Sequence, residues 1–305
     1  MRITNYELRI TRAPRFFSAL VFLCALCAFA GNAFAQSNLE FFAETIRRGN
    51  VEQKRDALFH IRNLENAAAS GVAVPALTDK SEIVRAAAAF SVIFLPADEA
   101  VAVLSPLLND KKEFVRREAA YALGKTRNTN AVNSLLRVLQ KDKVLEVRAA
   151  SVVALGLIGD AAAVSELIKI LQRKPSEKEE FLRRSAARSI GQIAQIIQTN
   201  KVKVQTPEDF LPDKNISIDE PKYPNLIEAF PTFRTANETL IQILQNRREA
   251  DDVKRETAFA LGAIGDTSAI PVLQSNLDAE DYYLAEISRE ALRKITLLSQ
   301  INNRK

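Results

Sequence analysis

Apolar and small residues recur at helical spacing in seven copies of one phrase. The two clearest copies are VRAASVVALGLIGDAAAVSEL at 147–167 and VKRETAFALGAIGDTSAIPVL at 253–273. Each copy keeps apolar or small residues at its first, fifth or sixth, and ninth positions, which places them on one helix face. The copies begin at residues 53, 84, 115, 147, 182, 253 and 287, so the period is 31 to 35 residues with one gap of 71.

A second, shorter helical pattern precedes most copies, as in AVNSLLRVL at 131–139 and ANETLIQIL at 236–244. Gly-Asp at 159–160 and at 265–266 ends one helix and starts the next, because Gly accepts left-handed backbone angles and Asp caps the following amides. The repeat is therefore a pair of antiparallel helices. Since one pair cannot bury its apolar face alone, the pairs must stack. The sequence predicts an all-α, right-handed α-solenoid of about seven helical hairpins.

Two short motifs carry a family resemblance. L-G-x-I-G-D occurs at 155–160 and at 261–266, and D-x-x-x-x-V-R begins at Asp79, Asp110 and Asp142. The chain after residue 38 resembles the HEAT repeat in the subtype named after phycobilisome lyases. That resemblance implies a solenoid but selects no function, because scaffolds, lyase subunits, a metal-dependent hydroxylase and DNA glycosylases all use such repeats.

Residues 1–35 have a different pattern. A leader with four arginines and one Glu precedes the apolar run 16–30, and small residues follow at Ala33 and Ala35. This order predicts a signal peptide cleaved between Ala35 and Gln36, and hence an exported protein, periplasmic or extracellular, without a membrane span after cleavage. The alternative is an uncleaved N-terminal anchor that leaves the rest of the chain facing outside.

Removal of this leader changes the charge and the cysteine content. The formal net charge of +5 falls to +2, because the leader takes four positive charges and one negative charge with it. Nucleic-acid binding is therefore not expected, since it needs a strong basic footprint. Both cysteines, Cys24 and Cys27, lie in the leader. The mature chain would have none, which suits an oxidising compartment.

Residues that could support catalysis or bind a metal are scarce. His60 is the single histidine and no His-Glu dipeptide occurs, whereas the HEAT-like deoxyhypusine hydroxylases hold two irons with His-Glu pairs. We interpret His60 as a packing or surface residue, and the paired acids at 179–180 and 251–252 as helix-start residues that stabilise amide dipoles. We predict no catalytic residue, cofactor or metal.

Basic residues recur in one slot of the repeat. An Arg lies six positions after an Asp in three repeats, and we predict that each Arg meets that upstream Asp. These pairs would form a structural ladder between neighbouring repeats. The predicted ladder consists of Asp79, Arg85, Asp110, Arg116, Asp142 and Arg148. The second basic residue of each doublet is freer to meet a ligand, and these residues are Arg117, Arg184 and Arg255.

The double gap contains a Pro-rich insertion at 199–234, which separates repeats one to five at 36–198 from repeats six and seven at 235–305. It holds five of the eleven prolines and four aromatic residues, Phe210, Tyr223, Phe230 and Phe233. Its apolar content is too high for a solvated tether. We expect it to dock either on the solenoid, as a structural flap, or on a partner.

Binding is the function that these features favour. We predict an exported, non-catalytic scaffold that holds a protein or an extended peptide through the concave face of the solenoid and the insertion. The candidate contact residues are Arg117, Arg184 and Arg255, together with the four aromatic residues of the insertion. A role resembling bilin lyase subunits, as a prosthetic-group attachment factor, is the alternative, and a spacer without a specific ligand is a third class.

Overall fold

The computed structural model describes residues 38–199, 222 and 225–302, and every regular element in these ranges is helical. The first helix covers residues 38–48, and several short 3-10 turns join the helices that follow. These are α2 (Val51–Asn63), α3 (Ala67–Ala73), α4 (Glu82–Ser91), α5 (Ala97–Leu104), α6 (Glu113–Thr126), α7 (Val132–Lys141), α8 (Leu145–Ile158), α9 (Val164–Leu171), α10 (Glu180–Thr199), α11 (Leu226–Ala229), α12 (Thr232–Gln245), α13 (Asp251–Ile264), α14 (Ile270–Gln274) and α15 (Tyr282–Asn302).

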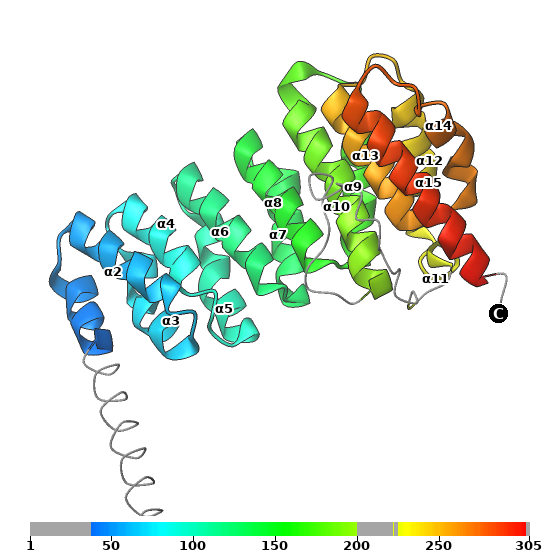
Figure 1. The fold of residues 1–305 in the computed structure, drawn as a ribbon. Coiled ribbons are helices and arrows are strands. Elements are labelled where there is room, and N and C mark those ends of the chain that lie inside the picture. Colours follow the sequence, from blue (N-terminus) through cyan, green and yellow to red (C-terminus); the bar gives the residue numbers. More distant parts are fainter. Residues whose placement is uncertain (1–37, 200–221, 223–224, 303–305) are drawn as a thin grey trace, which may run out of the picture.

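The helices that carry the repeated phrase form one layer of an elongated array (Figure 1). In this second-helix layer α2, α4, α6, α8, α10, α13 and α15 each pack against the next. The first helix of each hairpin forms the other layer, which consists of the helix over 38–48, α3, α5, α7, α9, α12 and α14. The described ranges therefore contain seven hairpins, and the predicted all-α solenoid is confirmed.

The recurring Leu-Gly pair lets neighbouring second helices approach closely. A Cβ atom on Gly124 of α6 would lie 2.6 Å from the Cα of Ala154 on α8, and one on Gly262 of α13 would lie 2.7 Å from the Cα of Ala291 on α15. Real Cβ atoms do not approach a backbone so closely, so only Gly fits there. The Gly in the phrase therefore sets the spacing of the stack.

The Gly-Asp pair separates helices as predicted. Gly159 ends α8 with φ 82°, and the side chain of Asp160 accepts a hydrogen bond from the Ala162 amide. Gly265 ends α13 with φ 81°, and Asp266 accepts one from the Ser268 amide. Both junctions combine a left-handed C-cap with an N-cap, so each hairpin turns within a few residues.

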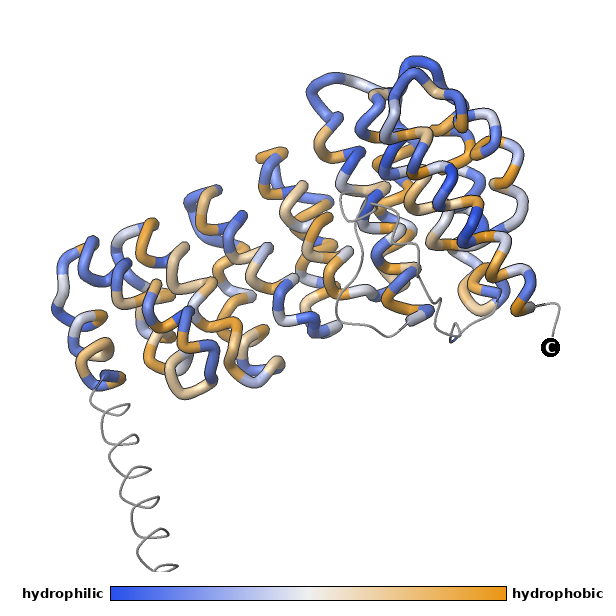
Figure 2. The backbone as a smooth tube through the Cα atoms, in the orientation of Figure 1, coloured by the Kyte–Doolittle hydropathy of each residue, from blue (hydrophilic) through white to orange (hydrophobic). Residues whose placement is uncertain are grey.

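One apolar core runs through the array, from Ile46 in the first helix to Ile295 in α15. Hydrophobic positions recur in every helix of both layers, while the connections before α10 and α13 are hydrophilic (Figure 2). Within the described ranges, no helix combines the length and apolar character needed to cross a bilayer.

The insertion does not interrupt the stack, because α10 packs directly against α13 and α9 against α12. Its two ends belong to helices: Thr199 is the last residue of α10, and 232–234 form the first turn of α12. Phe210, Tyr223 and the leader with its Ala35 and Gln36 lie outside the described residues.

The described end of the insertion docks on the solenoid. The amide of Lys222 donates to the carbonyl of Gln198 at 2.8 Å. Leu226 and Ile227 of α11 are buried in the common core. For this part of the insertion, the structural flap is the correct alternative.

Candidate partner-binding surface

The predicted ladder exists, but its carboxylates come from the following repeat. Arg85 donates to both carboxylate oxygens of Asp110 at 2.7 and 2.9 Å, and to the backbone carbonyl of Asp79 at 2.8 Å. Arg116 makes the same contacts with Asp142, at 2.7 and 3.0 Å, and with the Asp110 carbonyl at 2.9 Å. The predicted pairing with the upstream carboxylate is wrong. The upstream Asp accepts a hydrogen bond from the guanidinium through its backbone carbonyl, and not through its side chain.

The two ends of this ladder also differ from the prediction. Lys54 extends it to the first repeat through a 2.7 Å ion pair with Asp79. Arg148 does not pair with Asp142, whose two oxygens are held by Arg116, and donates to the carbonyl of Leu139 at 3.2 Å. Within the described ranges no carboxylate forms an ion pair with Arg148, so the ladder stops at the fourth repeat.

Electrostatics keep the ladder aspartates ionised. Burial raises the pKa of Asp110, but hydrogen bonds from Arg85 and the Lys112 amide, together with the Arg85 charge, outweigh it and hold the pKa below its ordinary value. The pKa of Asp142 is lowered in the same way, since Arg116 and the Val144 amide outweigh burial. These side chains have a structural role and are not available to a ligand.

Each of the three candidate contact arginines combines an acid and an aromatic ring, and Arg255 does so with Tyr283 at 5.3 Å from the ring centroid. Arg117 pairs with Glu118 at 2.9 Å, and its guanidinium lies 5.1 Å from the centroid of the Phe114 ring. Arg184 pairs with Asp252 at 2.7 Å and lies 5.2 Å from the Phe181 ring. Arg117 and Arg184 remain partly exposed, so they stay candidate contacts, although each already has a partner.

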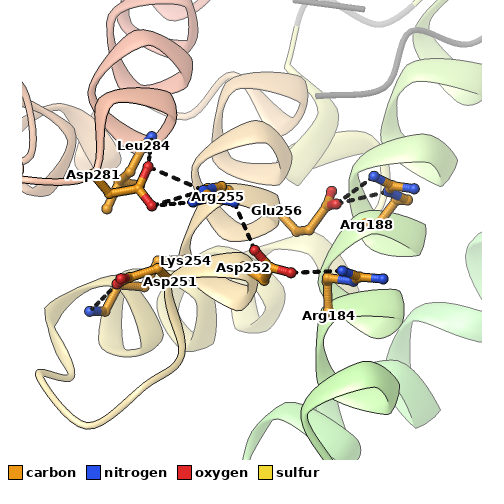
Figure 3. Close-up of polar contacts among 9 residues, drawn as sticks. All are labelled: Arg184, Arg188, Asp251, Asp252, Lys254, Arg255, Glu256, Asp281 and Leu284. Atoms are coloured by element: carbon orange, nitrogen blue, oxygen red, sulfur yellow. Dashed lines mark hydrogen bonds and ion pairs between the residues drawn. The ribbon is translucent and has the colours of Figure 1, made fainter. Parts of the chain in front are cut away.

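Arg255 is a ladder residue and not a free contact residue, so that prediction is wrong. Its Nε lies 3.0 and 3.1 Å from the carboxylate oxygens of Asp281, and its Nη1 lies 2.8 Å from Asp252. Figure 3 shows that these contacts continue through Arg184 on α10, while Arg188 binds Glu256 beside them. The network ties α10, α13 and α15 together.

Phe233 is also misassigned as a contact residue. Its side chain is 0% exposed and belongs to the core, because Phe233 lies in the first turn of α12 on the face of the helix that packs against the stack. Phe230 packs against the same core and meets the Phe233 ring edge-on at 6.5 Å between centroids. The neighbouring prolines suggested a loop, whereas Pro231 is the N-cap residue of α12.

The second-helix layer is hollowed over α2, α4 and α6. This α4 hollow has a volume of about 610 Å³, and Ala86 and Ala87 of α4 form part of its lining. Three of its apolar side chains are substantially exposed, with Phe59 at 52%, Ile83 at 44% and Phe114 at 38%. Phe90, Leu58 and Ser91 complete its lining together with the charged residues Glu52, Arg55, Asp56, Arg62 and Glu118.

The hollow exists because α4 differs from its two neighbours, α2 and α6. At equivalent positions α2 carries Arg-Asp at 55–56 and α6 carries Arg-Glu at 117–118, whereas α4 carries Ala-Ala at 86–87. The short side chains leave space between two charged pairs. Alignment of the copies that start at 53, 84 and 115 would have revealed this gap. Sequence reasoning missed it because it sought what the copies share.

His60 does not line this hollow, although its neighbours Asp56 and Phe59 do. Its Nε2 is 3.6 Å from a carboxylate oxygen of Asp56, and its side chain is 54% exposed. Among the residues that the structure describes, no group of three or more His, Cys, Asp or Glu side chains could hold a metal ion.

Two family models match parts of the array. The model for HEAT repeats matches residues 71–156, and the model for the PBS lyase HEAT-like repeat matches 147–173 and 253–279. HEAT repeats are thus matched over 71–173 and 253–279. The solenoid also aligns with an engineered protein, at 19% identity and a TM-score of 0.50 over 85% of this chain and 68% of that one, a likeness of fold alone.

Two structures of natural proteins align over more of their own length, but with lower TM-scores. The complex of CpcE and CpcF of phycocyanin lyase from Nostoc sp. PCC7120 gives 17% identity and a TM-score of 0.46, covering 99% of both chains. Human deoxyhypusine hydroxylase gives 18% identity and a TM-score of 0.39, covering 88% of this chain and 99% of that one. No curated protein sequence matches the chain.

Proposed function

We propose that this chain is an exported scaffold that binds an extended peptide segment of a partner protein along the exposed side of the second-helix layer. The α4 hollow is its anchor site. Export rests on the leader pattern of residues 1–35 and is part of the proposal. HEAT arrays suit this role because stacked repeats present a long continuous surface.

The α4 hollow is the observation that carries the proposal. Its lining includes the methyl groups of Ala86 and Ala87, and Phe59 and Phe114 retain exposed ring surface. An apolar side chain placed there would bury its own surface and that of the rings. Burial of one such side chain contributes about 1.5 to 3 kcal/mol.

The charged residues that line the α4 hollow suit the backbone of a peptide better than a partner with a large net charge. Both signs flank the hollow, because its lining holds the bases Arg55 and Arg62 together with the acids Glu52, Asp56 and Glu118. Donors and acceptors are thus present for the carbonyl and amide groups of an extended chain. A strongly acidic or basic partner would meet repulsion from the groups of its own sign.

A row of rings sets the expected spacing of the partner's contacts. Phe59, Phe90 and Tyr121 occupy the same position in α2, α4 and α6. Packed helices lie about 8 to 10 Å apart, and an extended chain rises about 3.3 Å per residue. The partner is therefore expected to place a side chain against successive rings about every third residue. In the insertion, Phe210 and Tyr223 remain proposed additional contacts.

A displayed library of unstructured peptides, selected on the purified chain, tests the proposal. Enriched peptides should carry apolar residues about three positions apart, and Ala87→Glu should weaken their binding by about 10- to 100-fold, the loss of one buried anchor. The substitution suits the fold because the equivalent positions already hold Asp56 and Glu118. Ala68→Glu, on the exposed surface of α3, is the matched control.

Equal binding by the wild type and Ala87→Glu would remove the α4 hollow from the proposal. Failure to enrich any peptide would favour the spacer class. Visible absorbance from a tetrapyrrole that co-purifies with the chain would favour the attachment-factor alternative. Export is tested separately by intact mass, which should place the mature N-terminus at Gln36.

A further inference from the structure

The row of rings on the second-helix layer ends after the third hairpin. Phe59, Phe90 and Tyr121 hold one position in α2, α4 and α6, whereas that position is Val153 in α8 and Arg188 in α10. Two of the rings, Phe59 and Phe90, line the α4 hollow, and the third is partly exposed. The row therefore crosses three neighbouring helices, and the distance between packed helices sets its spacing.

This spacing decides which backbone conformation can follow the row. Packed helices lie about 8 to 10 Å apart. A β-strand covers that distance in about three residues, but its side chains alternate between two faces, so the third residue along points away from the rings. An α-helix returns to the same face after about 5.4 Å or about 10.8 Å, which fits less well. A polyproline II helix has three residues per turn and rises about 3.1 Å per residue, so every third side chain faces the row after about 9.3 Å.

We propose that the partner segment is proline-rich and binds as a polyproline II helix, with every third residue against one ring of the row. Its core covers about seven residues, because three contacts that lie three positions apart span that length. The inference rests on the peptide-binding proposal and deepens it, since it assigns the conformation and the composition of the partner.

The surface chemistry suits a backbone with few amide protons. A helical layer has no open sheet edge, because its own amides and carbonyls bond within each helix. Each amide of a bound segment therefore needs a side-chain acceptor, and Pro removes that need. The carbonyls that remain need donors. Arg55 and Arg62 line the hollow, and among the residues that the structure describes neither forms an ion pair with a carboxylate.

The aromatic rings suit the same partner. Grooves lined by aromatic side chains are the usual binding sites for polyproline II segments, whose conformation is already formed before binding. In the α4 hollow, Phe59 and Phe114 retain exposed ring surface. The guanidinium of Arg62 lies 5.5 Å from the Phe59 ring centroid and that of Arg117 lies 5.1 Å from the Phe114 ring centroid.

Fluorescence anisotropy with three labelled peptides tests the proposal. The first peptide holds three Leu-Pro-Pro units, and the second holds three Leu-Ser-Ser units with the same spacing of leucines. The third has the composition of the first, but its leucines are consecutive. The first should bind about tenfold or more tightly than each of the others, because its backbone is already ordered and its register fits the row. Circular dichroism of the free peptides verifies their conformations.

A pair of variants tests the row itself. Phe59→Ser should weaken binding of the Leu-Pro-Pro peptide by about tenfold, the loss of one ring contact. Phe181→Ser, outside the row, is the matched control and should leave binding unchanged. The two rings are 52% and 47% exposed, and each lies against a guanidinium, Arg62 at 5.5 Å and Arg184 at 5.2 Å.

Equal affinity for the Leu-Pro-Pro and Leu-Ser-Ser peptides would refute the polyproline II conformation, and equal weakening by the two substitutions would refute the row. Either result leaves the peptide-binding proposal in place, since that proposal needs only an extended segment at the α4 hollow. The peptide-binding proposal fails separately if none of the three peptides binds and the displayed library also yields none.

Discussion

Glu249→Gln is expected to destabilise the junction between the fifth and sixth hairpins by about 3 kcal/mol. Arg183 and Glu249 form an ion pair whose side chains are 1% and 2% exposed. The Arg183 guanidinium also donates to the carbonyls of Ile170, Leu171 and Arg173 at 3.1, 3.0 and 2.7 Å. Substitution of Glu249 leaves these contacts in place but removes the only carboxylate that the described residues pair with this buried cation.

The size of the effect follows from burial. Loss of one partner of a buried pair costs about 3 to 5 kcal/mol, and the amide of Gln still accepts one hydrogen bond, which places the value at the low end. Asp252 is the exposed control, because its side chain is 36% exposed and those of its partners Arg184 and Arg255 are 36% and 32% exposed. Asp252→Asn is expected to cost at most about 1 kcal/mol.

Urea unfolding followed by circular dichroism measures both values. A third variant, Arg183→Met with Glu249→Leu, should recover most of the lost stability, because it removes the buried charges together. If Glu249→Gln costs no more than Asp252→Asn, or if the double variant is the least stable of the three, the buried pair does not act as we describe.

Three further outcomes are expected. Gly124→Ala should cost about 1 to 3 kcal/mol in the same unfolding assay, since its Cβ would lie 2.6 Å from the Ala154 Cα. Because the pKa values of Asp110 and Asp142 are lowered from 3.8, their stabilisation is present above that pH and lost as the pH falls through the lowered values, so Asp110→Asn should flatten acid unfolding. Burial lowers the pKa of Lys294 to about 8; wild-type stability should therefore rise from pH 8 toward 10.5, and Lys294→Met should stabilise the chain at pH 7 by roughly 2 kcal/mol in thermal melts.

Periodicity was sufficient to predict the solenoid. The phrase encodes its own local geometry, since Gly159 and Asp160 terminate and restart helices wherever they occur in the chain. The number of hairpins could be predicted because the gap of 71 residues contains one ordinary repeat in addition to the insertion between α10 and α12. These features depend on residues that are close in the sequence, so a sequence pattern is sufficient to predict them.

Pairing between repeats was harder to predict. The carboxylate that holds Arg85 lies 25 residues downstream, so the choice between Asp79 and Asp110 depends on how far one hairpin advances over the next. Arg255 looked unpaired for the same reason. Phe233 was assigned to the loop because the prolines before it indicate that a helix has ended. They do not show where the next helix begins.

The ladder is interrupted at one place, which leaves two series of hairpins tied by ion pairs. Lys54, Arg85 and Arg116 tie the first four hairpins in series, and the contacts from Arg183 to Asp281 tie the last three. Between them, at Arg148, no described ion pair crosses this edge of the array. At this joint α8 and α10 are held by packing and by the hydrogen bond from the Ser189 hydroxyl to the Val152 carbonyl at 2.9 Å, so high salt should weaken the contacts within either series more than the joint between them.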